Sequence, residues 1–193
     1  QISERSSLEI KKILNEIKKM RIKTLYFADS LGSLKPSDIK KIIFTLKKSW
    51  NGEIGIHTHD NMGKALDNSL EAVKYGVNWV DSTVLGMGRG PGNTKTETAI
   101  LEFNKTNKKK IDQVPILNLI DEWFKPLREK YNWGSNNYYY LAGLKGVHPT
   151  FVQTMLGDPT FKPDQILNNI NHLSKIGGKS YIKELINSNE QLY

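Results

Sequence analysis

The fold is decided by residues 53–76, which read EIGIHTHDNMGKALDNSLEAVKYG. The first five residues have the pattern of a β-strand, and a polar loop follows them. A helix pattern comes next and continues to Gly76, because a glycine commonly ends a helix. The stripe of residues that this helix is expected to turn toward the core consists of Leu66, Ser69, Leu70 and Val73. The segment therefore predicts one unit of strand, loop and helix.

The same unit occurs on both sides of this segment. A short apolar run, residues 24–28, ends at Asp29, and Pro36 then opens a helix with an apolar stripe. Downstream, residues 77–82 predict a third strand, which a glycine-rich loop and a helix over residues 96–103 follow. Recurrence of this unit at roughly 25 to 30 residues predicts parallel β/α architecture.

Other elements flank these units. Ser6 and Glu9 have the spacing of a capping box at the start of an amphipathic helix. We therefore divide the chain into three β/α units over residues 1–104, a polar lysine-rich connector over residues 105–112 and a mainly α-helical segment over residues 113–193. Apolar residues at helical spacing predict helices in that last segment: Ile116, Ile120, Trp123 and Leu127, then Ile166, Ile170 and Leu173. We expect this tail to pack onto another part of the protein.

Composition excludes several classes of protein. The 28 Lys and Arg residues exceed the 20 Asp and Glu residues and give a net charge of +8. Eight lysines stand in four doublets opposite apolar stripes, as on a solvated helix face, so we expect no nucleic-acid partner. No apolar run approaches the length of a membrane span. The chain has no cysteine, which excludes disulfides and thiol chemistry and fits a cytoplasmic protein. It begins with Gln1, and we expect it to be part of a longer protein.

Polar side chains follow each predicted strand. They are Asp29 and Ser30 after the first strand, residues 57–61 after the second, and residues 81–83 after the third. Parallel β/α folds place their sites at this edge, because the loops after the strands converge on one face. The strand ends therefore predict one site.

The pattern His57-Thr58-His59 is the sharpest feature of that site. Residues i and i+2 of a strand point the same way, so both imidazoles can face one divalent ion. The alternative is one buried structural histidine and one exposed histidine. The position at a strand end, directly before Asp60 and Asn61, favours the metal site. Because ligation needs neutral imidazoles, we expect metal affinity to fall as the pH drops through about 6.5.

Several other residues have two interpretations. The loop over residues 86–92 is either a phosphate cradle or a flexible turn, and the amide oxygen of Asn93 at its end can reach an ion. Asp29 either orients a metal ligand or caps its own loop. Asp81 has the same two interpretations, with a structural hydrogen bond favoured.

The tail adds two further positions. The tyrosines at 138–140 are mainly packing residues, and we take the hydroxyl of Tyr140 as the one that closes over a substrate. His148, before Pro149, is read as a turn residue rather than a ligand.

These motifs together resemble the HMG-CoA-lyase-like metal-dependent TIM barrels. The resemblance covers roughly residues 1–104 and matches strands six to eight of that barrel. The matching residues are Asp29-Ser30-Leu31-Gly32 with Pro36, Gly55 to Asn61, and Asp81-Ser82-Thr83 with Gly88, Gly90, Pro91-Gly92-Asn93 and Glu97. The tail is similar to the helical C-terminal segment of the 4-hydroxy-2-oxovalerate aldolase branch. The resemblance implies an α/β chain that forms the C-terminal part of a (β/α)8 barrel and ends in a helical tail.

The resemblance also implies a function. It places a divalent metal on His57 and His59, with Asn93 near or on the metal, and it implies substrate contacts for Ser30 and Asn93. Mn²⁺ or Mg²⁺ is expected, with Zn²⁺ or Co²⁺ as alternatives. The metal stabilises the enolate of a 2-oxo acid, so the implied enzyme is an aldolase or lyase that cleaves or forms a carbon–carbon bond. A Claisen-type 2-oxo-acid/acyl-CoA synthase and a non-catalytic half-barrel binding module remain as alternatives.

One departure from the family pattern concerns completeness. The family's remaining metal ligand, an Asp beside a catalytic Arg, lies on the first strand, and a barrel needs eight strands where we count three. The aldolases also have a catalytic His shortly after that strand. We therefore expect the missing barrel half to come from a preceding segment or from a partner chain, and we expect a homo-oligomer.

Overall fold

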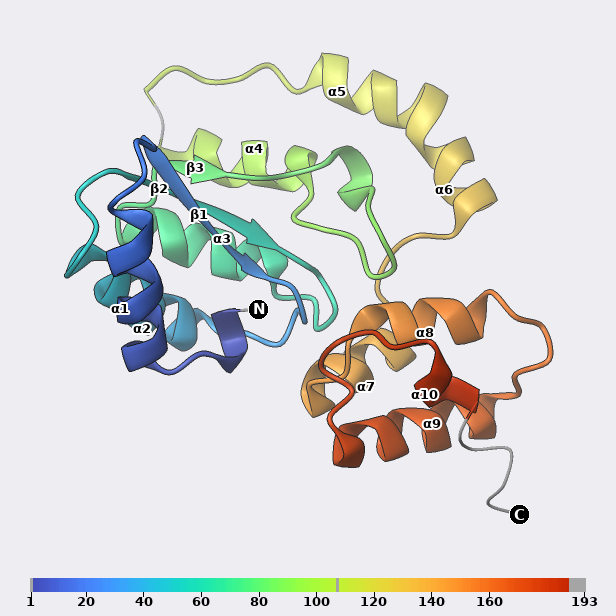
Figure 1. Cartoon of the computed structure of the whole chain (residues 1–193). Coiled ribbons are helices and arrows are strands. Elements are labelled where there is room, and N and C mark those ends of the chain that lie inside the picture. Colours follow the sequence, from blue (N-terminus) through green and yellow to red (C-terminus); the bar gives the residue numbers. More distant parts are fainter. Residues whose placement is uncertain (1, 107, 188–193) are drawn as a thin grey trace.

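The computed structural model describes residues 2–106 and 108–187, which form a β/α part and a helical tail (Figure 1). The β/α part contains η1 (Ile2–Glu4), α1 (Ser7–Ile17), β1 (Thr24–Asp29), α2 (Pro36–Lys47), β2 (Glu53–Thr58), α3 (Ala65–Lys74), β3 (Trp79–Val80), η2 (Val84–Gly86) and α4 (Thr96–Thr106). The tail contains α5 (Val114–Leu119), η3 (Ile120–Phe124), α6 (Lys125–Tyr131), α7 (Asn137–Lys145), α8 (Pro149–Leu156), α9 (Pro163–Ile176) and α10 (Glu184–Asn187).

The three strands form a parallel sheet in the order β1-β2-β3, as predicted. The predicted third strand is too long, because the structure assigns only Trp79–Val80 to β3. The N–H of Val77 donates to the carbonyl of Ala72 and closes the end of α3, which takes Val77 out of the ladder. Asp81 still donates its N–H to the carbonyl of Ile56 and continues the strand direction at the other end.

The helices α1, α2 and α3 cover one face of the sheet, and the side chains between them form the first core (Figure 1). The capping box of Ser6 and Glu9 is present at the start of α1, and the apolar face predicted for the helix that Pro36 opens, α2, lies in this core. The stripe predicted for α3 is wrong, because Val73 is 39% exposed and α3 contributes Ala72 to this core instead. The most deeply buried members of the core are Leu14, Ile39, Ile43, Ile54 and Ile56.

The other face of the sheet, which we call the open face, carries alternate residues of the same strands. Tyr26 and Trp79 on this face are 45% and 51% exposed. Between them in the sheet, Gly55 leaves room for an aromatic ring, since a Cβ there would lie 2.4 Å from Cζ of Tyr26. Within the described residues, the open face therefore presents aromatic side chains to solvent.

The tail begins with one long helical run, which contains the helix predicted from Ile116, Ile120, Trp123 and Leu127 and extends beyond it at both ends. Helical structure continues from α5 through α6, and the middle segment, η3, is a π-helix. Upstream of this run, α4 continues to Thr106, two residues into the stretch expected as a connector. No described helix is both long enough and apolar enough to cross a membrane.

The rest of the tail folds around a second core formed mainly by α7, α8 and α9. The tyrosine stretch lies in α7, and the helix predicted around residues 166–173 is α9. His148 is the N-cap residue of α8 and accepts a hydrogen bond from the N–H of Thr150 through Nδ1, which agrees with its interpretation as a turn residue.

The tail packs onto the loops that follow the strands, which confirms that it covers another part of the chain. Trp133 donates its indole N–H to the carbonyl of Leu85 over 3.1 Å, and Ser135 donates its hydroxyl to the carbonyl of Asn61 over 2.7 Å. A side chain at Gly143 would meet Met62 at 2.9 Å, so α7 approaches the loop after β2 closely. The tail therefore lies over the edge at which the sequence predicts a site.

Candidate active site

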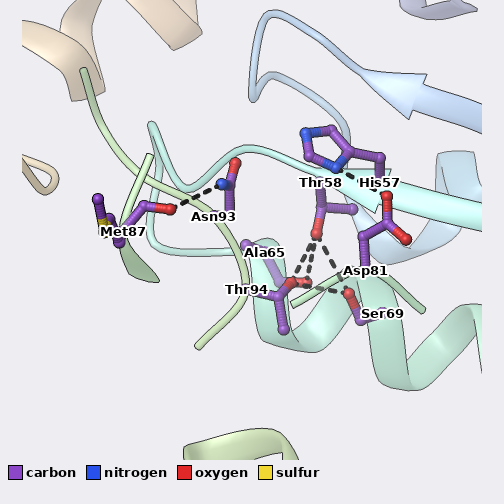
Figure 2. A network of polar contacts seen from close by, with 8 residues as sticks. All are labelled: His57, Thr58, Ala65, Ser69, Asp81, Met87, Asn93 and Thr94. Atoms are coloured by element: carbon purple, nitrogen blue, oxygen red, sulfur yellow. Dashed lines mark hydrogen bonds and ion pairs between the residues drawn. The ribbon is translucent and has the colours of Figure 1, made fainter. Parts of the chain in front are cut away.

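His57, in β2, and His59, directly after β2, lie on the same side, as the strand alternation predicts. Thr58, between them, points the other way and joins a buried cluster of hydroxyl groups (Figure 2). Its Oγ1 lies 2.7 Å from Oγ1 of Thr94 and 3.2 Å from Oγ of Ser69. This cluster ties the end of β2 to α3 and to the segment before α4. The rings of His57 and His59 are nearly perpendicular, with centroids 5.1 Å apart.

Asp81 orients the first of these rings. Its Oδ2 lies 3.2 Å from Nδ1 of His57 (Figure 2). In a neutral imidazole this contact assigns the proton to Nδ1, which leaves Nε2 with a free lone pair. Burial and the nearby Asp81 carboxylate, to which Tyr26 also hydrogen-bonds, raise the pKa of Tyr26. Asp81, directly after β3, therefore hydrogen-bonds both to His57 and to Tyr26 of the open face. This agrees with the hydrogen-bonding role favoured from the sequence.

The second ring belongs to a more enclosed residue. Burial is the main cause that lowers the pKa of His59 to about 4, and the positive charges of His57 and Arg89 lower it further. Its Nδ1 is buried and has no hydrogen-bond partner among residues 2–106 and 108–187. At neutral pH His59 is thus uncharged, the state that a metal ligand needs. For this residue, burial moves the expected loss of metal affinity to a pH lower than 6.5.

Asn93 lies next to His59 because the glycine-rich loop folds back onto the end of β2. The two residues form an antiparallel β-bridge, and the N–H of Asp60 donates to the carbonyl of Gly92. The side-chain amide of Asn93 donates to the carbonyl of Met87 over 3.3 Å (Figure 2). Its Oδ1 is buried without a partner in the part of the chain that the structure describes. Two unpaired polar atoms, Nδ1 of His59 and Oδ1 of Asn93, therefore belong to neighbouring residues.

The glycines permit this close folding. A Cβ at Gly88 would lie 2.4 Å from Nδ2 of Asn93, so only glycine fits against the amide. Gly92 adopts a φ of +80°, a left-handed conformation that L-residues rarely take. The loop sequence is thus explained by its close approach to Asn93.

The carboxylate of Asp29 accepts hydrogen bonds from the backbone of the loop that follows it. Its two oxygens accept the N–H groups of Ser33 and Leu34, each over 3.1 Å. These contacts are those of a loop cap, one of the two roles considered for Asp29. Burial raises the pKa of Asp29 to about 6, although the backbone hydrogen bonds act in the opposite direction. Ser30, the next residue, is half-buried at the end of β1.

We expect the carboxyl group of Asp29 to titrate near pH 6. Its pKa is raised in the folded state, so the folded protein binds a proton that the unfolded chain releases near pH 4. The contribution of this group to the free energy of unfolding should therefore increase as the pH falls from 7 to about 5. A ¹³C NMR titration of Asp-labelled protein measures the midpoint, and exposed Asp158, whose pKa is lowered by hydrogen bonds from Thr160, serves as the control. A midpoint below 4 for Asp29 would contradict the effect of burial.

Tyr140 lies on the exposed side of α7, where 45% of its surface is accessible. Its neighbour Tyr139 is buried and packs against the glycine loop instead, since a Cβ at Gly90 would lie 3.1 Å from the Tyr139 hydroxyl oxygen. Burial raises the pKa of Tyr139 to about 12. The sequence contained the tyrosine cluster but no signal for which ring faces the loop. A catalytic role of Tyr140 stays a prediction.

The structure thus brings together His57, His59, Asp81 and Asn93. Among the residues that it describes, no group of three or more His, Asp or Glu side chains could hold a metal ion. The imidazole pair therefore supplies two side-chain nitrogens, and Asn93 lies beside it with its amide oxygen unpaired.

The family model described as HMGL-like matches residues 2–120. The chain belongs to the HMGL-like family. The match covers the sheet, both histidines and Asn93, and it confirms the resemblance on which the functional expectations rest.

Curated relatives of this HMGL-like chain are 4-hydroxy-2-oxovalerate aldolases. The protein from Carboxydothermus hydrogenoformans is 30% identical over 159 residues, which are 80% of this chain and 47% of that protein. The protein from Pseudoalteromonas translucida is 34% identical over 132 residues, 66% of this chain and 38% of that protein. The chain therefore spans less than half the length of these relatives.

Solved structures confirm the fold class. The N-terminal domain of a proposed aldolase from Bacteroides vulgatus superposes with a TM-score of 0.69 and 32% identity, covering 79% of this chain and 49% of that one. The Bacillus subtilis HMG-CoA lyase gives a TM-score of 0.57 at 21% identity, covering 68% of this chain and 45% of that one. The HMGL-like chain thus has the predicted fold, β/α units of a TIM barrel with a helical tail.

Proposed function

We propose that this chain supplies the C-terminal half of the active site of a divalent-metal-dependent aldolase or carbon–carbon lyase. The enzyme would cleave or form a carbon–carbon bond at the carbon next to the keto group of a 2-oxo acid. The reaction would pass through the enolate of that acid. The observation that carries the proposal is the convergence of His57, His59 and Asn93 at the end of β2. Family membership and the 4-hydroxy-2-oxovalerate aldolases among the relatives support it.

The residues present fit a divalent metal. Nδ1 of His59 and Oδ1 of Asn93 are buried without hydrogen-bond partners in the described ranges. Burying a polar atom in this way costs folding free energy unless a ligand supplies the missing interaction. His57, His59 and, through its amide oxygen, Asn93 would hold the ion. Mn²⁺ or Mg²⁺ is proposed, because oxygen ligands from substrate and water suit these ions, and Zn²⁺ or Co²⁺ are the alternatives. A bound cation would supply Lewis acidity that stabilises negative charge on a keto oxygen.

The neighbouring residues prepare the site for this task. Asp81 accepts the Nδ1 proton of His57 and fixes the tautomer that leaves Nε2 free. The Thr58 cluster holds the strand end so that both rings keep their direction. Arg89 places a positive charge near His59, which favours an anionic substrate such as a 2-oxo acid. We propose that Ser30 and Asn93 contact this substrate.

A second protein segment is part of the proposal. The curated relatives are more than twice as long as the stretch that they share with this chain, and the open face exposes Tyr26 and Trp79. A preceding segment or a partner chain that completes the barrel would cover that face and supply the remaining ligand. We call this chain together with that segment the assembled enzyme, and we expect it to be a homo-oligomer.

The experiment that tests the function is exchange of the methyl protons of pyruvate in D₂O. The assembled enzyme with Mg²⁺ should catalyse exchange, and removal of the cation by EDTA should abolish it. Cleavage of a 4-hydroxy-2-oxo acid then supports an aldolase, whereas condensation that requires an acyl-CoA identifies a Claisen-type synthase. Exchange that is absent, with metal bound and the protein folded, would favour the non-catalytic binding module and refute the proposal.

A further inference from the structure

A cavity of about 480 Å³ lies between the glycine-rich loop and the tail. Its walls include Met87, Gly88 and Gly90 from the loop and Trp133, Tyr139 and Gln153 from the tail. This volume falls within the range of small-molecule binding sites, and two buried aromatic side chains among the walls are typical of such sites. Neither of the proposed metal-ligating histidines lines it.

The side chains that line the cavity are uncharged. None of the lining residues is Lys, Arg, Asp, Glu or His, and the polar lining side chains include three amides, Asn132, Asn136 and Gln153. A charged ligand would lose hydration here without an ionic partner from the lining. A purely apolar ligand would leave the amides without partners. The walls therefore suit a neutral molecule that has hydroxyl groups on a carbon chain.

Several polar groups are available to such a molecule. Oδ1 of Asn136 already accepts the N–H groups of Tyr138 and Tyr139, which leaves its NH₂ group to donate. The hydroxyl of Tyr139 and the side-chain amide of Gln153 make no hydrogen bond to other residues that the structure describes. Trp133 is fixed by its bond to the carbonyl of Leu85, so its ring offers a rigid apolar surface. Hydroxyl groups can both donate to and accept from these partners.

The cavity adjoins the candidate metal site through the glycine loop. Gly88 lines the cavity, and a Cβ on this residue would lie 2.4 Å from the amide nitrogen of Asn93. Gly90 lines it too and is in close contact with the hydroxyl of Tyr139. Gly88 thus both lines the cavity and lies against the side-chain amide of Asn93.

We propose that this cavity binds the hydroxylated carbon chain of an aldehyde acceptor, a molecule of the chemical class of short sugars. The inference rests on the proposed function. In the addition reaction, the methyl carbon of pyruvate loses a proton and bonds to the aldehyde carbon. The aldehyde oxygen takes up the electron pair of its π bond and a proton, and becomes the new hydroxyl. The product contains all atoms of both substrates, so no oxidant or reductant is needed.

Binding can be measured without turnover by using erythritol, a four-carbon polyol without a carbonyl group. Saturation-transfer difference NMR on the metal-free assembled enzyme should show binding. Gln153→Ala and Tyr139→Phe should each weaken it by about tenfold, equivalent to about 1.4 kcal/mol. Gln113→Ala is the matched control, because this glutamine lies at the start of α5, outside the cavity lining, and makes no side-chain capping bond. Equal erythritol binding by the wild type and both cavity variants, all folded by circular dichroism, would overturn the assignment of the cavity.

The kinetic arm separates this inference from the proposed function. With pyruvate, kcat/KM for D-erythrose should exceed that for acetaldehyde by at least about tenfold, and Gln153→Ala should reduce this preference. Pyruvate exchange without any preference for the hydroxylated aldehyde overturns the inference alone. Erythritol binding that depends on Gln153, in an enzyme without pyruvate exchange, supports the cavity as a polyol site and refutes the aldolase function.

Discussion

Replacing His57 by alanine in the assembled enzyme should remove the bound metal and lower kcat by on the order of a thousandfold or more. The expected loss corresponds to several kcal/mol of transition-state stabilisation by a Lewis acid. His59→Ala should have the same effect, because both rings face the same side of β2. Asp81→Ala keeps both rings and loses only the orientation of His57, so we expect a smaller loss of metal affinity, about 10- to 100-fold.

Two control variants accompany these three. His172→Ala removes a histidine on α9, in the tail, and Lys109→Ala removes a charge on the exposed segment before α5. Both should keep the metal content and the rate. Metal content is measured by inductively coupled plasma mass spectrometry and the rate by pyruvate exchange. Unchanged metal and rate in His57→Ala would show that the histidine pair is structural and that the family roles do not transfer to it.

The second large effect is on association, because this chain expressed by itself should not be a stable monomer. Tyr26 and Trp79 are 45% and 51% exposed on the open face, and the outer edges of β1 and β3 pair with no other described strand. Exposed aromatic surface and unpaired strand edges promote self-association. We expect dimers or larger aggregates at micromolar concentration.

Sedimentation velocity measures this association. Trp79→Lys should reduce this self-association, because it replaces an exposed aromatic ring on the open face by a charged side chain. The new charge would lie close to Glu53, whose carboxylate accepts the indole N–H of Trp79 over 2.8 Å. Phe44→Lys is the matched control, since Phe44 is 49% exposed on α2, which packs on the opposite face of the sheet. A sharp 22.0 kDa monomer with a cooperative melting transition would show that the open face needs no partner.

The sequence was sufficient for features that depend on local pattern. The alternation along β2 and the residue after it correctly placed His57 and His59 on one side, because side-chain direction in extended chain has a period of two. The apolar spacing in α2 correctly identified the face that packs into the first core, since amphipathic spacing determines which face is buried. The stripe predicted for α3 was wrong, because the small residue Ala72 rather than Leu66, Leu70 or Val73 faces that core. The third strand was predicted too long because the hydrogen bond from Val77 to Ala72 is a property of the α3 terminus rather than of strand propensity.

Other parts of the site depend on contacts between distant segments. Whether Asp81 meets His57 is decided by the register that pairs Gly55 with Trp79, which no local pattern contains. The choice between Tyr139 and Tyr140 depends on how α7 packs against Gly90, because consecutive helix residues point about 100° apart. The cavity beside the glycine loop arises from loop and tail together, and neither segment predicts it alone.

Pulsed electron paramagnetic resonance of Mn²⁺ bound to the assembled enzyme tests the central claim most directly. The proposed site predicts ¹⁴N modulation from two imidazole nitrogens, reduced to one in His57→Ala or His59→Ala wherever a variant retains manganese. His172→Ala should leave the modulation of both nitrogens intact. Bound Mn²⁺ without ¹⁴N modulation in the wild-type protein would contradict the assignment of His57 and His59 as metal ligands.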